Sequence, residues 1–300
     1  GPGLWVEHQL DAGHQAPLAD VADVAECGEL PQATAEEIGL RVAALHLRLA
    51  APLLVTDPAS AELIKYAANA FLALKITYIN EIALLCEALG SDIGTVAKGI
   101  GSDSRIGEKF LKAGPGYGGS CFPKDTLALV KTAQDARTPI RLIETATALN
   151  EQHKRSMAFK IVDACGGSVR GKKIAVLGLT FKANTDDMRE SPSLSIIRTL
   201  QDFGAKVSAY DPEGMENARS LLDSVEFADN AYEAAKDAHA TVVVTEWSEF
   251  ADLDFGRMAD AMAGNAFVDL RNVTTTKKVH GSGLVLTALG RSLDRYADTA

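Results

Sequence analysis

The residues that decide the fold read KIAVLGLTFKANTDDMRESP, from Lys173 to Pro192. A short apolar run, Lys173–Leu179, is followed by a polar loop, and Ser191-Pro192 then provides a usual start for a helix. Further strands are predicted at Val207–Tyr210, Thr241–Thr245 and Ala266–Leu270, and helices at Ser193–Phe203 and Glu213–Leu222. Strands that alternate with helices predict a parallel sheet covered on both faces. We therefore expect a Rossmann-like domain over residues 171–300.

The part of the chain before this sheet is predicted to be all-helical. Its clearest helix, Pro58–Leu89, is apolar nearly all round, which indicates burial in a domain centre or a subunit interface. Shorter helices are predicted at Ile93–Ile100, Arg105–Ala113, Asp125–Gln134 and Ile140–Cys165. The expected fold class is thus α + α/β, with a helical dimerisation and catalytic domain at residues 57–165 and a hinge at 166–171. Residues 1–56 are predicted to be a linker or remnant containing one helix, Ala35–Ala51.

The composition is that of an ordinary soluble protein. The 300 residues are 47% hydrophobic and 23% charged, which is enough for two domains with cores. A net charge of −10 argues against a general nucleic-acid or anionic-membrane binder. The four cysteines form no CxxC pair, so a reducing cytoplasm is the expected compartment. No apolar run reaches the roughly 20 residues of a membrane span, and no metal site is expected.

The strongest chemical signal is the stretch GPGYGGSCFPKD, Gly114–Asp125. Its four glycines allow the backbone to approach a ligand closely. Cys121 follows the glycines and precedes a predicted helix, with Lys124 nearby. A helix N-terminus and a cation both favour the thiolate, so Cys121 is a candidate nucleophile. From the local chemistry alone, a buried structural cysteine in a glycine-rich turn is an equally good interpretation.

Two further groups of polar residues are candidates for binding or catalysis. Lys65 and Asn69 lie four apart on one helix face, where they could bind an oxyanion or position water, or could be a snorkelling Lys beside an interface Asn. Lys182 and Arg271 follow two predicted strands, at the sheet edge where α/β folds bind ligands. The loop that carries Lys182 and Arg189 has one glycine where a dinucleotide site has three, so a plain surface loop is its alternative. Asp211 is interpreted as a turn residue before Pro212.

Taken together, these segments resemble one family. The segments SAELIKYAANAFLALKITYINEIALLCE, GIGSDSRIGEKFLKAGPGYGGSCFPKD, GLTFKANTDDMRESP, YDP, TEW and DLRN have the order and spacing found in the UDP-glucose and GDP-mannose dehydrogenases. The resemblance covers about Thr56 to Arg291. It implies NAD-dependent, four-electron oxidation of UDP-glucose to UDP-glucuronate through a cysteine thiohemiacetal and thioester. The alternatives are a GDP-mannose or UDP-N-acetyl-hexosamine 6-dehydrogenase, or a non-catalytic sugar-nucleotide-binding and dimerisation fragment. Ser120 stands where the UDP-N-acetylmannosamine group tends to carry His, which favours UDP-glucose.

The resemblance also implies roles for individual residues. Lys65 and Asn69 match residues that stabilise an oxyanion or hold water, and Asp125 matches a carboxylate that positions or activates water. The remaining matches are Lys124 and Arg189 on the cofactor side, and Tyr117, Gly118, Lys182 and Arg271 on the substrate side. Arg105 matches an arginine that reaches the substrate of the neighbouring subunit, which implies a homodimer or higher homo-oligomer.

The sequence differs from the family in its N-terminal part. Members of the family begin with a Rossmann domain that binds most of the NAD, and residues 1–55 have no strand followed by a glycine-rich turn and a helix. We therefore expect the chain alone to bind UDP but to have negligible NAD-dependent activity.

Overall fold

The computed structural model describes residues 54 and 56–291, so the predicted helix Ala35–Ala51 and nearly all of the predicted linker lie outside the described residues. The chain divides into two compact units, residues 1–65 and residues 66–300. The boundary falls within the first described helix, α3 (Pro58–Leu89), whose predicted bounds are confirmed. Asp57 caps the start of α3, because its Oδ1 accepts from the Ser60 amide at 3.0 Å. Gly90 ends the helix in the left-handed conformation, with φ 71°.

Three further helices belong to the helical region: α4 (Ile93–Gly101), α5 (Phe122–Asp135) and α6 (Arg141–Ala164). The predicted helix Arg105–Ala113 is wrong, because this segment consists of turns and irregular backbone. Gly107 and Phe110 both have positive φ, 71° and 64°, which a right-handed helix does not allow. The segment is held instead by Lys75, whose Nζ donates to the Ile106 carbonyl at 2.9 Å.

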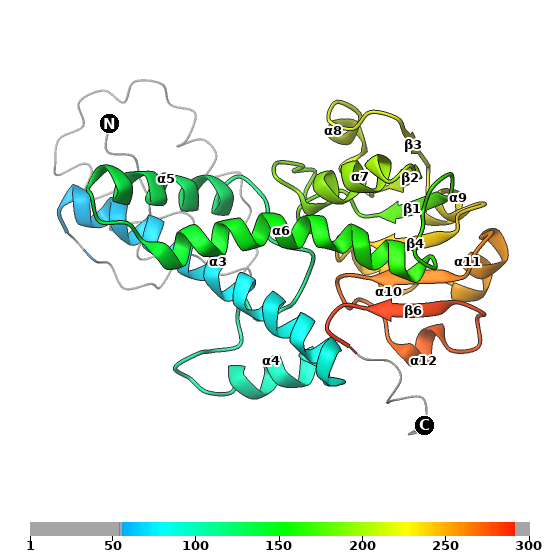
Figure 1. Ribbon diagram of the computed structural model, residues 1–300, viewed down its shortest axis with the longest axis horizontal. Helices are drawn as coiled ribbons and strands as arrows, with labels where there is room; N and C mark the ends of the chain where they lie inside the picture. Colours follow the sequence, from blue (N-terminus) through cyan, green and yellow to red (C-terminus); the bar gives the residue numbers. More distant parts are fainter. Residues whose placement is uncertain (1–53, 55, 292–300) are drawn as a thin grey trace. The chain divides into compact units, whose positions relative to one another are not determined.

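Among the described residues, 173–288 form a parallel sheet of six strands in the order β3-β2-β1-β4-β5-β6 (Figure 1). The strands are β1 (Lys173–Leu177), β2 (Lys206–Tyr210), β3 (Val225–Phe227), β4 (Ala240–Val243), β5 (Ala266–Asp269) and β6 (Val285–Ala288). The helices between them are α7 (Pro192–Asp202), α8 (Met215–Arg219), α9 (Ala231–Ala235), α10 (Ser248–Ala251), α11 (Phe255–Ala261) and α12 (Thr276–Val279). The predicted parallel α/β arrangement is confirmed, and the sequence reading missed the edge strands β3 and β6 and the short helices α9 to α12.

The two faces of the sheet are covered by different helices. On one face, Ile79 of α3, Met157 and Ile161 of α6, and Ile196 of α7 belong to the same apolar cluster as Val176 of β1. On the other face, residues of α9, α10, α11 and α12 pack against β1, β4, β5 and β6. Within residues 66–291, α3, α6 and α7 therefore share a core with one face of the sheet, and α9 to α12 form a second core with the other face. The strand order reverses between β1 and β4, the point at which ligands bind beyond the carboxyl ends of parallel strands.

Across the described part of the chain, none of the helices combines the length and the apolar content that a membrane crossing needs.

Candidate functional site

The glycine-rich segment before α5, residues 114–121, is here named the thiol loop. Its backbone is buried and bonded by side chains from two helices. The amide of Gly114 donates to Asn80 Oδ1 of α3 at 2.9 Å, and its carbonyl lies 2.9 Å from His153 Nε2 of α6. Asn150 of α6 makes a double contact with Tyr117, accepting from its amide at 2.9 Å and donating to its carbonyl at 3.2 Å. Hydrogen bonds between these side chains and the main chain thus fix the loop, as expected for buried main-chain groups, which need a partner.

The glycines of the thiol loop are required by close neighbours. Gly119 has φ 84°, and a Cβ there would lie 2.8 Å from the Phe181 ring. A Cβ on Gly118 would overlap the carbonyl oxygen of Glu190. The Gly119 amide also donates to the Arg189 carbonyl at 2.8 Å. The thiol loop therefore packs directly against the loop that follows β1, residues 178–191, which is here named the β1 loop.

Cys121 ends the thiol loop and is the N-cap residue of α5. It is half-buried, and its Sγ lies 3.6 Å from Ser120 Oγ. Lys124 follows in the first turn of α5 and is exposed. Arg189 of the β1 loop is also exposed; its hydrogen bonds to Asp187 raise the pKa of the guanidinium, and the charge of Cys121 adds to the same shift. Arg189 therefore lies close enough to Cys121 for their charges to interact, and Lys124 lies three residues after Cys121 in the sequence.

Asn69 and Asp125 meet beside the thiol loop. Asn69 Nδ2 of α3 donates to Asp125 Oδ2 of α5 at 2.7 Å, and both side chains are buried. Asp125 lies one turn after Cys121, and its amide donates to the Cys121 carbonyl at 2.8 Å. Lys65 lies on α3 one turn before Asn69 and is also buried, at 6% exposure. A buried carboxylate held by an amide is an arrangement that can orient a water molecule.

Tyr117 and Arg105 have very different surroundings. Tyr117 is buried, with its ring edge-on to Phe122 at a centroid distance of 6.1 Å. Burial raises the pKa of Tyr117, which keeps the phenol neutral. The side chain of Arg105 is 87% exposed and pairs with Asp103 in the same turn. Such a side chain is available to a neighbouring molecule.

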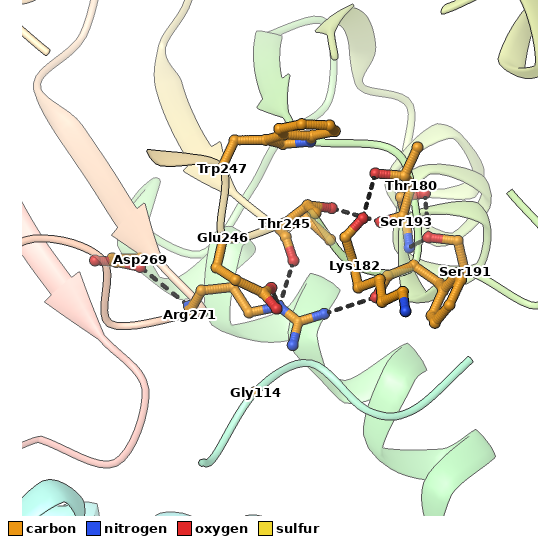
Figure 2. A network of polar contacts seen from close by, with 12 residues as sticks. Gly114, Thr180, Lys182, Ser191, Ser193, Thr245, Glu246, Trp247, Asp269 and Arg271 are labelled. Carbon is orange, nitrogen blue, oxygen red and sulfur yellow. Dashed lines mark hydrogen bonds and ion pairs between the residues drawn. The ribbon is translucent and has the colours of Figure 1, made fainter. Parts of the chain in front are cut away.

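Arg271 follows β5 and connects three segments (Figure 2). Its Nε donates to the Val244 carbonyl at 2.7 Å and lies 3.1 Å from Glu246 Oε2, and its Nη2 donates to the Phe181 carbonyl at 3.3 Å. Burial lowers the pKa of Arg271, and the charges of Glu246 and Asp269 oppose that shift. A Cβ on Gly114 would lie 2.9 Å from Arg271 Nη1, so the guanidinium lies against the thiol loop.

Lys182 is exposed on the β1 loop, with its Nζ 5.3 Å from the centre of the Phe181 ring. The structure thus places Lys182 and Arg271 on neighbouring loops at the carboxyl edge of the sheet, as the sequence predicts. The start of the β1 loop is fixed by hydroxyl groups: Ser191 and Ser193 donate to the Leu179 carbonyl at 2.6 and 2.5 Å. Thr245 donates to the Thr180 carbonyl at 2.6 Å.

Asp211, at the end of β2, is a residue whose importance the sequence reading underestimated. As predicted, it forms a turn, because its Oδ1 accepts from the amides of Glu213 at 3.0 Å and Gly214 at 2.7 Å. Its Oδ2 also accepts from the amides of Leu179 at 2.6 Å and Thr180 at 3.1 Å, and from Trp247 Nε1 at 3.1 Å. The signal that could have revealed this is an acidic residue at the end of a strand in a domain without a GxGxxG turn.

The segment after β1 lacks the three-glycine turn that binds a dinucleotide pyrophosphate. Gly178 has φ 89°, but a Cβ there would lie 2.5 Å from that of Thr245, so this glycine serves strand packing and not ligand approach. The start of α7 is closed by the hydroxyls of Ser191 and Ser193. Lys124 and Arg189 remain as exposed cations that could contact a cofactor. Within residues 54 and 56–291, no group of three or more His, Cys, Asp or Glu side chains could hold a metal ion.

Comparison with known proteins identifies the family of the chain. Residues 59–152 match the central domain of the UDP-glucose/GDP-mannose dehydrogenase family, and residues 175–276 match the UDP binding domain of the same family. The chain belongs to the UDP-glucose/GDP-mannose dehydrogenase family.

Individual relatives give the degree of similarity. Over 240 residues the chain is 58% identical to UDP-glucose 6-dehydrogenase of Rhizobium meliloti (strain 1021), covering 80% of this chain and 55% of the relative. It is 44% identical to UDP-glucose 6-dehydrogenase TuaD of Bacillus subtilis (strain 168), covering 82% and 54%. A solved UDP-glucose dehydrogenase from the archaeon Pyrobaculum islandicum superposes with a TM-score of 0.73 at 35% identity, covering 84% of this chain and 57% of that one. The chain spans about half the length of the curated relatives it matches.

Proposed function

We propose that this chain carries the thiol site and the nucleotide site of a UDP-glucose 6-dehydrogenase, which oxidises UDP-glucose to UDP-glucuronate with NAD. The observation that supports this most is the position of Cys121, at the start of α5 and one turn from the Asn69–Asp125 pair. The 58% identity to a relative named UDP-glucose 6-dehydrogenase supports the choice of UDP-glucose over other sugar nucleotides.

The proposed chemistry follows from the need to hold one carbon through two oxidations. NAD would accept one hydride from the alcohol carbon and, in the second oxidation, one from the thiohemiacetal carbon. The Cys121 thiolate forms a carbon–sulfur bond to the aldehyde, which keeps the intermediate on the protein, and Lys65 and Asn69 stabilise the resulting oxyanion. At the thioester level, water adds to the carbonyl carbon and Asp125 accepts its proton. The carbon–sulfur bond then breaks, which restores the Cys121 thiolate and releases the carboxylate.

The substrate is proposed to bind between the thiol loop and the sheet edge. Lys182 and Arg271 provide the cations for the diphosphate and nucleoside, and charge-assisted hydrogen bonds from such groups hold phosphates firmly. Tyr117 and Gly118 would border the sugar. Lys124 and Arg189 are assigned to the cofactor side. Because the segment after β1 lacks the three-glycine turn of a dinucleotide site, we assign most of the NAD-binding surface to residues other than the described ones.

The proposed assembly is a homodimer through α3. The exposed residues Phe71, Tyr78 and Leu85 are seven apart and form an apolar stripe along this helix. A stripe of this kind on a soluble protein indicates an interface between copies, and Arg105 would then reach the partner's substrate. Replacing Tyr78 with Lys should shift the chain to monomer in sedimentation at micromolar concentration. A wild-type chain that sediments as a monomer would rule out the dimer.

Titration calorimetry on one sample tests the choice of ligand. UDP-glucose should bind at least about tenfold more tightly than GDP-mannose, and NAD should bind weakly or not at all. Tighter binding of GDP-mannose would make the chain a relative of the second branch of the family. If the chain binds none of the sugar nucleotides, the remaining interpretation is a fragment that serves in dimerisation.

A further inference from the structure

The carboxylate of Asp211 lies at the point where three strands end, and it is 1% exposed. Its Oδ2 accepts hydrogen bonds from the segment after β1, through the amides of Leu179 and Thr180, and from the segment after β4, through the indole of Trp247. Its Oδ1 binds the turn after β2. One buried carboxylate thus joins the carboxyl ends of β1, β2 and β4. Figure 2 labels two of the residues that it contacts, Thr180 and Trp247.

Both proposed nucleotide-binding cations are connected to this carboxylate through intermediate residues. On one side, the Thr180 hydroxyl lies 3.2 Å from Asp211 Oδ2 and 2.9 Å from the Lys182 carbonyl. On the other side, Trp247 follows Glu246, and the Glu246 carboxylate pairs with Arg271. A shift of Asp211 would therefore move the backbone that carries Lys182 and the acidic partner of Arg271 together.

Asp211 itself is not placed to bind a ligand. In dinucleotide-binding folds, the acidic residue at the end of the second strand accepts from a ribose hydroxyl. Here both carboxylate oxygens are directed at main-chain and indole N–H groups of the protein, and Trp247, which covers Oδ2, is 7% exposed. The negative charge therefore stabilises contacts within the protein, because an ionised acceptor makes stronger hydrogen bonds than a neutral one.

We propose that Asp211 is a positioning residue for the nucleotide: it fixes the loops after β1 and β4 so that Lys182 and Arg271 meet one diphosphate. This inference rests on the proposed UDP binding. It makes a prediction opposite in sign to simple electrostatics. Removing a negative charge near an anion-binding site should strengthen UDP binding by Coulomb's law, whereas removing the positioning contacts should weaken it.

The test compares Asp211→Asn with Asp186→Asn in the full chain. Both variants remove one carboxylate from the same end of the sheet, but Asp186 is exposed and its side chain accepts only from Asn217, at 3.2 Å, among the described contacts. Calorimetry with UDP should show a loss of affinity of at least about tenfold for Asp211→Asn, and no loss for Asp186→Asn. Equal or tighter UDP binding by Asp211→Asn would overturn the proposal.

A second variant keeps the proposal testable if Asp211→Asn does not fold. Trp247→Phe removes one hydrogen bond to Oδ2 and leaves the carboxylate in place. It should weaken UDP binding by the folded protein several-fold, whereas a purely structural role would lower only the thermal midpoint and leave the affinity of the folded protein unchanged.

The fluorescence of Trp247 provides a separate readout of the same contact. The sequence holds two tryptophans, Trp5 and Trp247, so a Trp5→Phe background isolates the second. UDP should change the Trp247 emission in this background, and the change should be lost in Asp211→Asn. Failure of wild-type protein to bind UDP would refute the proposed function itself, while wild-type binding with an unaltered Asp211→Asn affinity would refute only the role of Asp211.

Discussion

The thiol loop and the β1 loop lie side by side. The same kind of contact holds both loops, but they differ in what they expose. Both are held by side chains that bond their main chain: Asn80, Asn150 and His153 for the thiol loop, and Asp211 with hydroxyl groups for the β1 loop. Residues 114–119 of the thiol loop are wholly buried, whereas the β1 loop exposes Lys182 and Arg189. The thiol loop therefore forms a rigid surrounding for the Cys121 sulfur, and the β1 loop exposes positively charged side chains.

The largest effect that would separate the two loops is loss of the thiol. Replacing Cys121 with Ala should reduce formation of UDP-glucuronate by at least about a thousandfold when the chain is supplied with NAD and an NAD-binding domain of a relative. UDP affinity should persist, because the proposed contacts with the diphosphate come from the β1 loop and from Arg271. Chromatography of the products checks the first statement and calorimetry the second. Undiminished acid production by the Cys121→Ala protein would refute the thioester route.

A second effect should arise where the two loops touch. Gly118→Ala would place a methyl group against the Glu190 carbonyl, which is main chain and cannot move independently. Overpacking of this kind should lower the free energy of unfolding by about 1–3 kcal/mol. The matched control is Gly99→Ala in α4, where a Cβ meets nothing within 4 Å and helix propensity should make the change neutral or stabilising. Equal midpoints for the two variants in urea unfolding would show that the loops do not pack as described.

A smaller effect should be a pH dependence of the free energy of unfolding that comes from His153, which holds the thiol loop through Gly114. Burial lowers the pKa of His153 below its ordinary 6.5, while its hydrogen bond to Gly114 and the charge of Glu87 oppose the shift and that of Lys160 adds to it. The unfolded chain therefore binds a proton more readily than the folded protein does. The contribution of His153 to stability is full above about pH 6.5 and is lost as the pH falls below it.

Unfolding in urea at a series of pH values checks this, with His153→Gln as the control. The wild-type protein should lose more stability between pH 7 and pH 5 than the variant, because the glutamine amide can donate to the Gly114 carbonyl but does not titrate. Identical pH profiles for the two proteins would exclude His153 as a titrating support of the loop.

The same contrast explains how far the sequence predicts the structure. Local patterns sufficed for α3, α6 and the four central strands, since period and caps lie within each segment. They failed for β3, which has only three residues, and for β6, whose partly exposed sequence VLTA forms no continuous apolar run. They failed also for Arg105–Ala113, where the positive φ of Phe110 has no local sign in the sequence.

The candidate site divides in the same way. Cys121, Lys182 and Arg271 follow recognisable local features, a glycine-rich turn or the end of a strand. The central position of Asp211 depends on donors at Leu179 and Trp247, which lie 32 and 36 residues away in the sequence. Contacts of that range are formed by the order of the strands, and a single-sequence reading does not supply that order.

Whether Cys121 borders a sugar-nucleotide site can be tested by measuring its rate of alkylation by iodoacetamide with peptide mass spectrometry. Burial raises the pKa of Cys86 and of Cys165, so these thiols should react slowly and serve as internal references. If the thiol loop borders a UDP-sugar site, UDP-glucose should slow the alkylation of Cys121 several-fold and leave both references unchanged. A Cys121 rate that does not respond to saturating UDP-glucose would contradict the account.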